Sequence, residues 1–267
     1  KDPVDKEEIV VAAFTGNNDL GFPNNDLYKS VEFMDPDIMF FSGDQIYESV
    51  GRYRYMRLRE GDIQKPTLDY LRKWYMLGWA YGELMKDRPT IAIPDDHDVY
   101  QSNIWGAGGI KATTDGDYTS NQTSGGYMMP PEWVNMVQKT QTANLPDPYD
   151  STTVEQGIEV YYTAMNYGGI SFAILEDRKF KSGPQLILPD AEIWNGWAQN
   201  PEYNVREESD VEGAELIGQR QLDFLEEWGE NWDKGIQMKA VLSQTIFANV
   251  ATIPDTSMND AVVPKMN

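Results

Sequence analysis

Short apolar runs in the first hundred residues predict the frame of the fold. Ile9–Phe14, Ile38–Phe41 and Thr90–Ile93 each have the length and composition of a buried β-strand. Stretches of helical periodicity separate them, over Asn25–Phe33 and over Pro66–Lys86. Strands and helices that alternate at this spacing predict right-handed crossovers, so we expect three parallel strands in one sheet of an α/β fold.

The second predicted helix carries large apolar residues at helical spacing. They are Leu68, Leu71, Tyr75, Trp79 and Leu84. Such a stripe is typical of a helix face that packs on the core, and we expect that placement. An exposed binding stripe is the alternative that the spacing leaves open.

A long irregular region and a hairpin follow. Gly106–Asp150 is rich in Gly, Ser, Thr, Asn and Pro, with one helical stretch at 132–140, and a loop of this length usually covers or shapes a site. Gly157–Met165 and Gly169–Glu176 show strand-like alternation on either side of an Asn-Tyr-Gly-Gly turn. This pattern predicts a β-hairpin.

An amphipathic helix and one more strand come last. The helix is expected over Glu212–Trp232 and the strand over Met238–Ser243. The helical residues expected to face inward are Leu216, Leu222, Leu225 and Trp228. The sequence contains no repeat, heptad run or interdomain linker, so we expect one domain over residues 1–267.

Polar residues follow each of the first three predicted strands. Asn17–Asp19 follows the first strand and Asp44 the second. The third leads into Asp95–Asp98, which contains His97, the only histidine in the chain. The carboxyl ends of parallel strands share one edge, where ligands and catalytic groups collect. We therefore expect these side chains to converge.

Carboxylates at this edge suit a cation. Several carboxylates around one imidazole repel one another unless a cation or solvent reduces the repulsion. A solvated acidic turn is therefore the alternative. Hard cations and iron(III) prefer oxygen ligands. Asp44, behind Gly43, is suited to bridge two ions, and Tyr47 can return to the same ion as a phenolate. Taken alone, the motif fits equally well a capped turn with Tyr47 buried.

Composition and missing motifs narrow the classes of function. A net charge of −21 argues against binding nucleic acid or anionic membranes through bulk electrostatics. The chain has no cysteine, which excludes disulfides, thiolate metal ligands and a cysteine nucleophile. No apolar run approaches the roughly 18 residues of a membrane span. The sequence has no GxSxG, Walker or GxGxxG motif, so His97 is not assigned to a serine triad.

Three motifs together resemble the alkaline phosphatase D (PhoD-like) family of the binuclear metallophosphoesterase superfamily. They are Gly43–Glu48 (GDQIYE), Pro94–Val99 (PDDHDV) with Asn103–Trp105, and Leu175–Arg178 (LEDR). The resemblance covers nearly the whole chain. It implies a four-layer α/β/β/α sandwich that holds iron(III) and calcium. It also implies hydrolysis of phosphate mono- and diesters by a secreted, periplasmic or cell-surface protein.

The resemblance also implies roles for single residues. Asp44 stands at the position of the bridging ligand and Tyr47 at that of the iron-binding tyrosine. Asp96 stands where the superfamily has the Asn of its GNHE motif, so it is expected to bind the second metal. His97 is expected to contact the substrate phosphate and to assist the leaving group. A hydrogen-bonded structural imidazole is the alternative for His97.

Arg178 and Asn17 match the pattern of the family less closely. Arg178 lies at an LDxR-like strand end and is expected to hold a phosphate oxygen through its planar fork. An ion pair with Glu176 or Asp177 is the alternative. Asn17 stands where better-known relatives have a cysteine or a carboxylate, which implies an altered or weaker iron site.

The superfamily closes its site with a late Gly-Asp-x-His segment that this sequence lacks. We therefore expect the chain, which ends at Asn267, to be the N-terminal portion of a longer polypeptide, with the C-terminal part of the fold missing. The expected partner is a small-molecule phosphate ester. A non-catalytic calcium-binding surface or assembly protein with the same fold is the alternative class. Glycoside hydrolysis by paired carboxylates would leave His97 and Tyr47 without a role.

Overall fold

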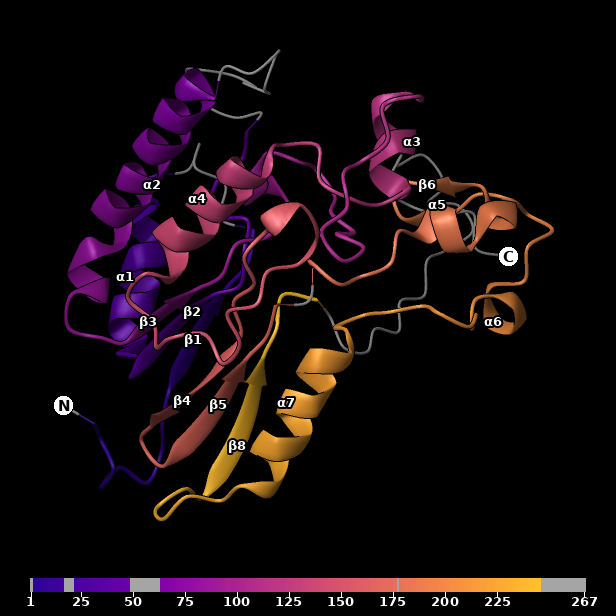
Figure 1. Ribbon diagram of the computed structural model, residues 1–267. Coiled ribbons are helices and arrows are strands. Elements are labelled where there is room, and N and C mark those ends of the chain that lie inside the picture. The colour runs from indigo at the N-terminus through magenta and orange to yellow at the C-terminus, as the bar shows by residue number, and fades with distance from the viewer. Residues whose placement is uncertain (1, 17–21, 49–62, 177, 246–267) are drawn as a thin grey trace.

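Within the part of the chain that the structure describes, two three-stranded sheets and a two-stranded ribbon form, with helices packed around them (Figure 1). The structure is a computed structural model and describes residues 2–16, 22–48, 63–176 and 178–245. This mixture of helices and strands confirms the predicted α/β class.

The first sheet is the frame that the sequence predicts. Its strands follow the order β1 (Val11–Phe14), β2 (Ile38–Phe41) and β3 (Thr90–Ala92), and both neighbouring pairs are parallel. α1 (Asn25–Met34) connects β1 to β2, and α2 (Gln64–Met85) precedes β3. β2 is buried along its whole length, as a strand covered on both faces must be. The prediction of three adjacent parallel strands is confirmed.

α1 and α2 cover one face of the first sheet. Phe14 of β1 and Phe41 of β2 stack with ring centroids 4.4 Å apart, and Tyr81 of α2 meets both rings edge-on. The other buried residues of this layer are Val31, Met39, Leu77, Ala80, Leu84 and Ala92. Aromatic pairs of this geometry add to the burial of apolar area, so this cluster fixes α2 against β1 and β2.

The second sheet joins the predicted hairpin to the last predicted strand. β4 (Thr163–Tyr167) pairs antiparallel with β5 (Ile170–Ile174) across Gly168 and Gly169, both at positive φ. β8 (Met238–Leu242) pairs with β5 in parallel. The hairpin and the last strand are therefore confirmed, although β4 and β5 are shorter than their predicted runs.

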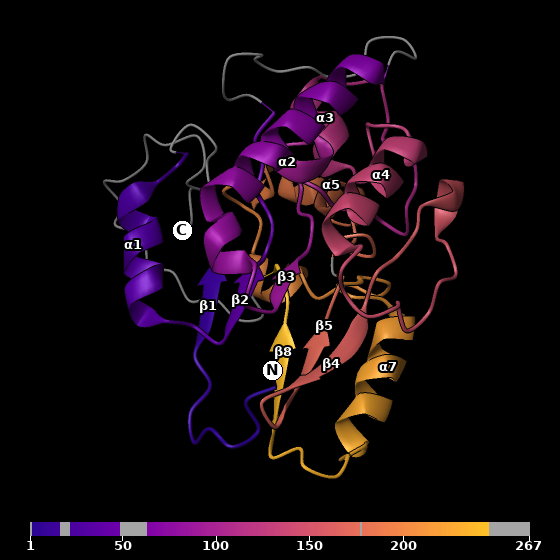
Figure 2. The same ribbon diagram turned by 90° about the vertical axis from the view of Figure 1, so that its left-hand side faces the viewer.

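The two sheets pack face to face. The buried residues between them are Ile38, Phe40, Ile91, Ile93, Tyr161, Phe172 and Ile174. On the far face of the second sheet, Phe224 of α7 (Gln219–Glu230) lies in one cluster with Ala173 and Leu175. The helices α1 and α2, the two sheets and α7 thus follow one another across the molecule in Figure 1. Figure 2 shows β1, β2 and β8 pointing toward the same end.

Short elements connect these layers. The region expected to be irregular contains α3 (Tyr118–Thr123) and α4 (Pro131–Thr142), of which only α4 matches a predicted helix. The remaining elements are the 3-10 turns η2 (His97–Val99), η3 (Glu155–Gly157) and η4 (Pro189–Ala191), the helices α5 (Pro184–Ile187) and α6 (Val205–Glu208), and the ribbon strands β6 (Ile193–Trp194) and β7 (Trp197–Ala198). None of the helices in the described ranges is both long and apolar enough to span a membrane.

The inward face of α2 differs from the prediction. The residues expected in the core but 44% to 73% exposed are Leu68, Leu71, Tyr75 and Trp79. The apolar residues that do face the core are Tyr70, Leu77, Tyr81 and Leu84. The prediction is therefore wrong except for Leu84. Both sets recur at helical spacing, and periodicity alone does not tell which of two apolar stripes packs on the sheet.

The predicted bounds of α7 are also wrong. The helix begins at Gln219 because Gly218, at φ 73°, has a backbone conformation that does not continue a helix. Leu216 lies before the helix, and both Leu216 and Leu222 are exposed instead of buried. Leu225 and Trp228 pack against the cluster under α7, as expected.

Packing between the sheets is tested by removing one ring. Phe172→Ala deletes a side chain that is 1% exposed, and it should lower the free energy of unfolding by about 3–5 kcal/mol. Phe33→Ala, at a ring that is 91% exposed, is the matched control and should change it by less than about 0.5 kcal/mol. Urea unfolding measures both variants, and equal effects would contradict the described packing.

Candidate metal centre

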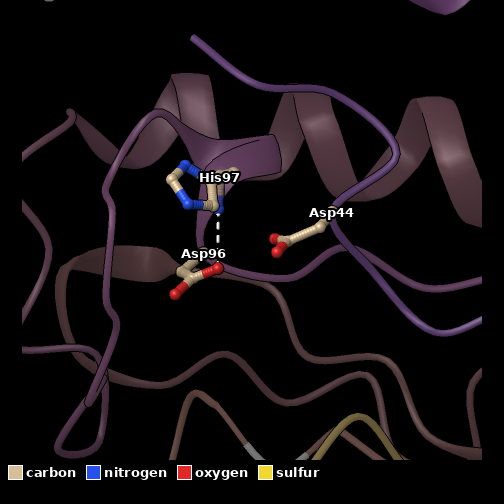
Figure 3. Close-up of side chains that lie close together, drawn as sticks. All are labelled: Asp44, Asp96 and His97. Carbon is tan, nitrogen blue, oxygen red and sulfur yellow. Dashed lines mark hydrogen bonds between the residues drawn. The ribbon is translucent and has the colours of Figure 1, made fainter. Parts of the chain in front are cut away.

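Two loops at the carboxyl edge of the first sheet bring three candidate ligands together (Figure 3). Asp44 follows β2, and Asp96 and His97 follow β3. One ligand atom from each lies within 4.8 Å of the others. In Figure 3 the carboxylate of Asp44 points toward the other two residues from the opposite loop. The carboxylates of Asp44 and Asp96 thus meet as expected, while metal binding by them stays a prediction. Asn17 lies outside the described residues.

A sharp turn after β2 aims Asp44 at the opposite loop. Gly43 has a φ of 108°, and a Cβ added there would lie 2.2 Å from the Cβ of Asp95. Any other residue at this position would push the two loops apart. Asp44 itself has a left-handed φ of 54°. Non-glycine residues in this region are strained, and such strain clusters at functional sites.

Asp98 ties the two loops together. Its Oδ2 accepts the backbone amides of Asp44 at 2.8 Å and Asp95 at 2.9 Å. Its Oδ1 accepts the side-chain amide of Gln141 at 3.0 Å. Burial and the nearby charge of Asp44 raise the pKa of Asp98 to about 8. From the sequence Asp98 is one member of an acidic run, and nothing in its spacing signals this connecting role.

Tyr47 contacts both Asp44 and His97. Its hydroxyl donates to Oδ2 of Asp44 at 3.0 Å, and its ring centroid lies 4.3 Å from that of His97. Burial and the charge of Asp44 raise the pKa of Tyr47 far above its ordinary value, so the side chain is a neutral phenol without a cation. A phenolate role for Tyr47 therefore requires a cation that offsets this shift.

Glu48 is a site residue that sequence reasoning missed. Its buried carboxylate lies 2.7 Å from Nδ1 of His97. Burial lowers the pKa of His97, but the hydrogen bond and charge of Glu48 outweigh it, so the pKa is raised above its ordinary value. With Nδ1–H donated to Glu48, Nε2 is the ring nitrogen that can act on another group. The place of Glu48 in the GDQIYE motif is the signal that points to it.

The cluster has the properties of a cation site. Burial and the charge of Asp95 raise the pKa of Asp96 well above its ordinary value. Oδ1 of Asp44 is buried and has no hydrogen-bond partner among the described residues. Buried carboxylate oxygens are normally hydrogen-bonded or bound to a cation. Because Asp44, Asp96 and Tyr47 offer the oxygen donors that calcium and iron(III) accept, the residues present fit a metal ion.

Arg178 approaches the cluster from the second sheet and is held by Asp95. Its Nε lies 2.5 Å from Oδ1 of Asp95, and Nη2 lies 3.0 Å from Oδ2 of the same carboxylate. Nη1 donates to the carbonyl of Ile104 at 3.2 Å, and Nη2 is 3.9 Å from Oδ2 of Asp96. The sequence offered Glu176 or Asp177 as the ion-pair partner; Asp177 lies outside the described residues, and the ion pair seen here is with Asp95, in the loop after β3.

The comparison with protein-family models agrees with the motifs. A family model described as PhoD-like phosphatase matches residues 13–263, so the chain belongs to the PhoD-like phosphatase family. A solved structure described as "Structure of PhoD" is similar with 17% sequence identity and a TM-score of 0.47. The similarity covers 81% of this chain and 38% of that one. No curated protein matches the sequence.

Calcium should stabilise the protein more at pH 8 than at pH 5. A carboxyl group whose pKa is raised in the folded state adds stability below its ordinary pKa and loses that contribution as the pH rises toward the folded value. The pKa values of Asp96 and Asp98 are both raised, that of Asp98 to about 8, so raising the pH from 5 to 8 removes protons from the cluster and increases its negative charge. A cation binds the ionised form. Melting temperatures with calcium and with EDTA measure the shift, and a larger calcium shift at pH 5 would contradict the account.

Proposed function

We propose that this protein hydrolyses phosphate mono- and diesters with a metal-activated water. The observation that carries the proposal is the convergence of Asp44, Asp96 and His97 at one sheet edge, in a chain of the PhoD-like phosphatase family. The buried, unpartnered oxygen of Asp44 supports a cation there.

Iron(III) and calcium are the ions that we propose for this centre. Asp44 would bridge the two ions, Tyr47 would bind iron as a phenolate, and Asp96 would bind the second ion. Asn17 would contribute at the end of the first strand. When bound, the ions stabilise charge on the phosphoryl oxygens and lower the pKa of the attacking water. The resemblance to the family and the oxygen donors of these residues support the assignment.

His97 is the proposed general acid. Glu48 holds Nδ1 of the imidazole at 2.7 Å and raises its pKa, so the protonated ring persists to higher pH than an isolated histidine. Tyr47 packs on the ring and limits its rotation. Nε2 would then donate a proton to the departing alkoxide.

Arg178 is the proposed phosphate ligand. Asp95 fixes the plane of the guanidinium through two contacts, and Nη2 reaches within 3.9 Å of Asp96. A planar guanidinium held at the edge of the cluster offsets charge on the phosphoryl oxygens. Asp95 would thus orient Arg178 for the substrate.

The proposal extends to the whole domain and its surroundings. The order of helices, sheet, sheet and helix supports a four-layer α/β/β/α sandwich, with residues 1–267 in one metallophosphoesterase domain. The net charge of −21 favours a small-molecule phosphate ester over nucleic acid as the partner. The family resemblance supports a secreted, periplasmic or cell-surface location.

The non-catalytic calcium-binding protein is not favoured. It would give no role to the contact between Glu48 and His97, or to the ion pair that orients Arg178. Glycoside hydrolysis by paired carboxylates is not favoured either, because it would leave His97 and Tyr47 without a role.

Asp44→Asn tests the proposed function. The change weakens the one ligand shared by both ions, so the complete protein should lose bound iron and calcium together with hydrolysis of p-nitrophenyl phosphate and of its bis-aryl diester. Elemental analysis and a colorimetric assay measure the two losses. Asp210→Asn, at an exposed position, is the matched control and should change neither. Hydrolysis by Asp44→Asn at the parental rate would overturn the proposal.

Two further variants separate an acid role of His97 from a structural one. His97→Ala should retain the metals and lower turnover by roughly 10²-fold. Glu48→Gln keeps a hydrogen-bond acceptor but removes the charge that raises the pKa of His97, so the alkaline limb of the pH–rate profile should move to lower pH. If His97→Ala loses the fold and the metals, or if the Glu48→Gln profile does not move, the structural imidazole is the correct interpretation.

A further inference from the structure

α2 carries a buried ion pair that reaches the loop after β2. Asp69 and Lys73 lie one helical turn apart, and neither side chain is exposed to solvent. Nζ of Lys73 is 3.3 Å from Oδ2 of Asp69 and donates to the carbonyl oxygen of Tyr47 at 2.6 Å. Lys73 of α2 therefore fixes the backbone of Tyr47, a candidate metal ligand.

The same pair reaches the turn after β3. Oδ2 of Asp69 accepts the hydroxyl of Tyr100 at 2.8 Å, and Nζ of Lys73 lies 5.8 Å from the centroid of the Tyr100 ring. Tyr100 is buried and ends the 3-10 turn that begins at His97, with its amide donating to the His97 carbonyl at 3.0 Å. One pair on one helix thus contacts both loops of the candidate metal centre.

Stability alone does not explain this pair. Removing two charges from water has a desolvation penalty that often exceeds their attraction, and apolar residues of similar volume usually serve stability as well or better. Apolar residues, however, do not supply directional hydrogen bonds. A hydrogen bond from Lys73 to the Tyr47 carbonyl and one from Tyr100 to Asp69 fix two backbone segments relative to the same helix.

We propose that Asp69 and Lys73 are positioning residues that set the spacing between the loop bearing Asp44 and Tyr47 and the turn bearing Asp96 and His97. Metal and catalytic sites need their first contacts held within about 0.5 Å by groups that are themselves fixed. The consequence for metal affinity rests on the proposed function, whereas the positioning of the loops does not.

The test combines two variants that avoid a lone buried charge. In Asp69→Asn/Lys73→Met, the asparagine still accepts from Tyr100 and the methionine fills the space of the lysine stem, but the contact with the Tyr47 carbonyl is lost. Tyr100→Phe removes only the connection to the turn. Leu77→Ala is the control: it lies on the same helix, is 1% exposed, and packs in the cluster of Phe14 and Tyr81, which contains no residue of either loop.

Hydrogen exchange in the complete protein measures the positioning directly. In the double variant, amides of 44–48 and 96–100 should exchange at least about tenfold faster than in Leu77→Ala at matched global stability. Tyr100→Phe should speed exchange in 96–100 only. If the double variant and Leu77→Ala show the same exchange in these segments, the positioning role is wrong, and Tyr100→Phe decides the matter if the double variant does not fold.

Calcium titration by calorimetry on the same proteins measures the consequence for the metal centre. The double variant should bind calcium at least about tenfold more weakly than Leu77→Ala. Equal affinities would overturn the effect on the metal centre. A parent protein that binds no calcium would count against the proposed function, while the exchange result would still decide the positioning.

Discussion

Asp98 accepts the amides of Asp44 and Asp95 through one oxygen, and this joins the end of β2 to the end of β3. The connection is buried, and hydrogen bonds in a low-dielectric interior are stronger than those at a surface. Gly43 permits this connection, because any side chain at that position would clash with Asp95. Lys73 adds a second connection from α2. The parallel order of β1, β2 and β3 places these loops at one edge, but the buried contacts set their separation.

The same contacts bring several carboxylates close together. Burial and the charge of Asp95 raise the pKa of Asp96, burial and the charge of Asp44 raise that of Asp98, and both shifts reflect desolvation of the carboxylates together with their mutual repulsion. Protons relieve it at low pH, and a cation would relieve it at neutral pH. Arg178, held by Asp95, and His97, held by Glu48, stand beside the cluster, where the proposed hydrolysis would use them.

The sequence predicts the frame and the main residues of the site because both are local signals. Apolar runs mark β1, β2 and β3, and the motifs around Asp44 and His97 stand directly after two of them. The inward face of α2 could not be predicted, since the helix has two apolar stripes of equal spacing and only packing distinguishes them. Glu48 and the Asp69–Lys73 pair escaped notice for a related reason, because their roles depend on partners 26 to 49 residues away.

The central claim is that the edge of β2 and β3 is a metal centre. Crystals of the complete protein grown with iron and calcium, with anomalous scattering recorded for each metal, test it most directly. The account predicts an ion about 2.0–2.6 Å from carboxylate oxygens of both Asp44 and Asp96, with the Tyr47 oxygen turned from Asp44 to the iron. Metal density elsewhere in the protein, with the Tyr47 hydroxyl still donating to Asp44, would contradict it.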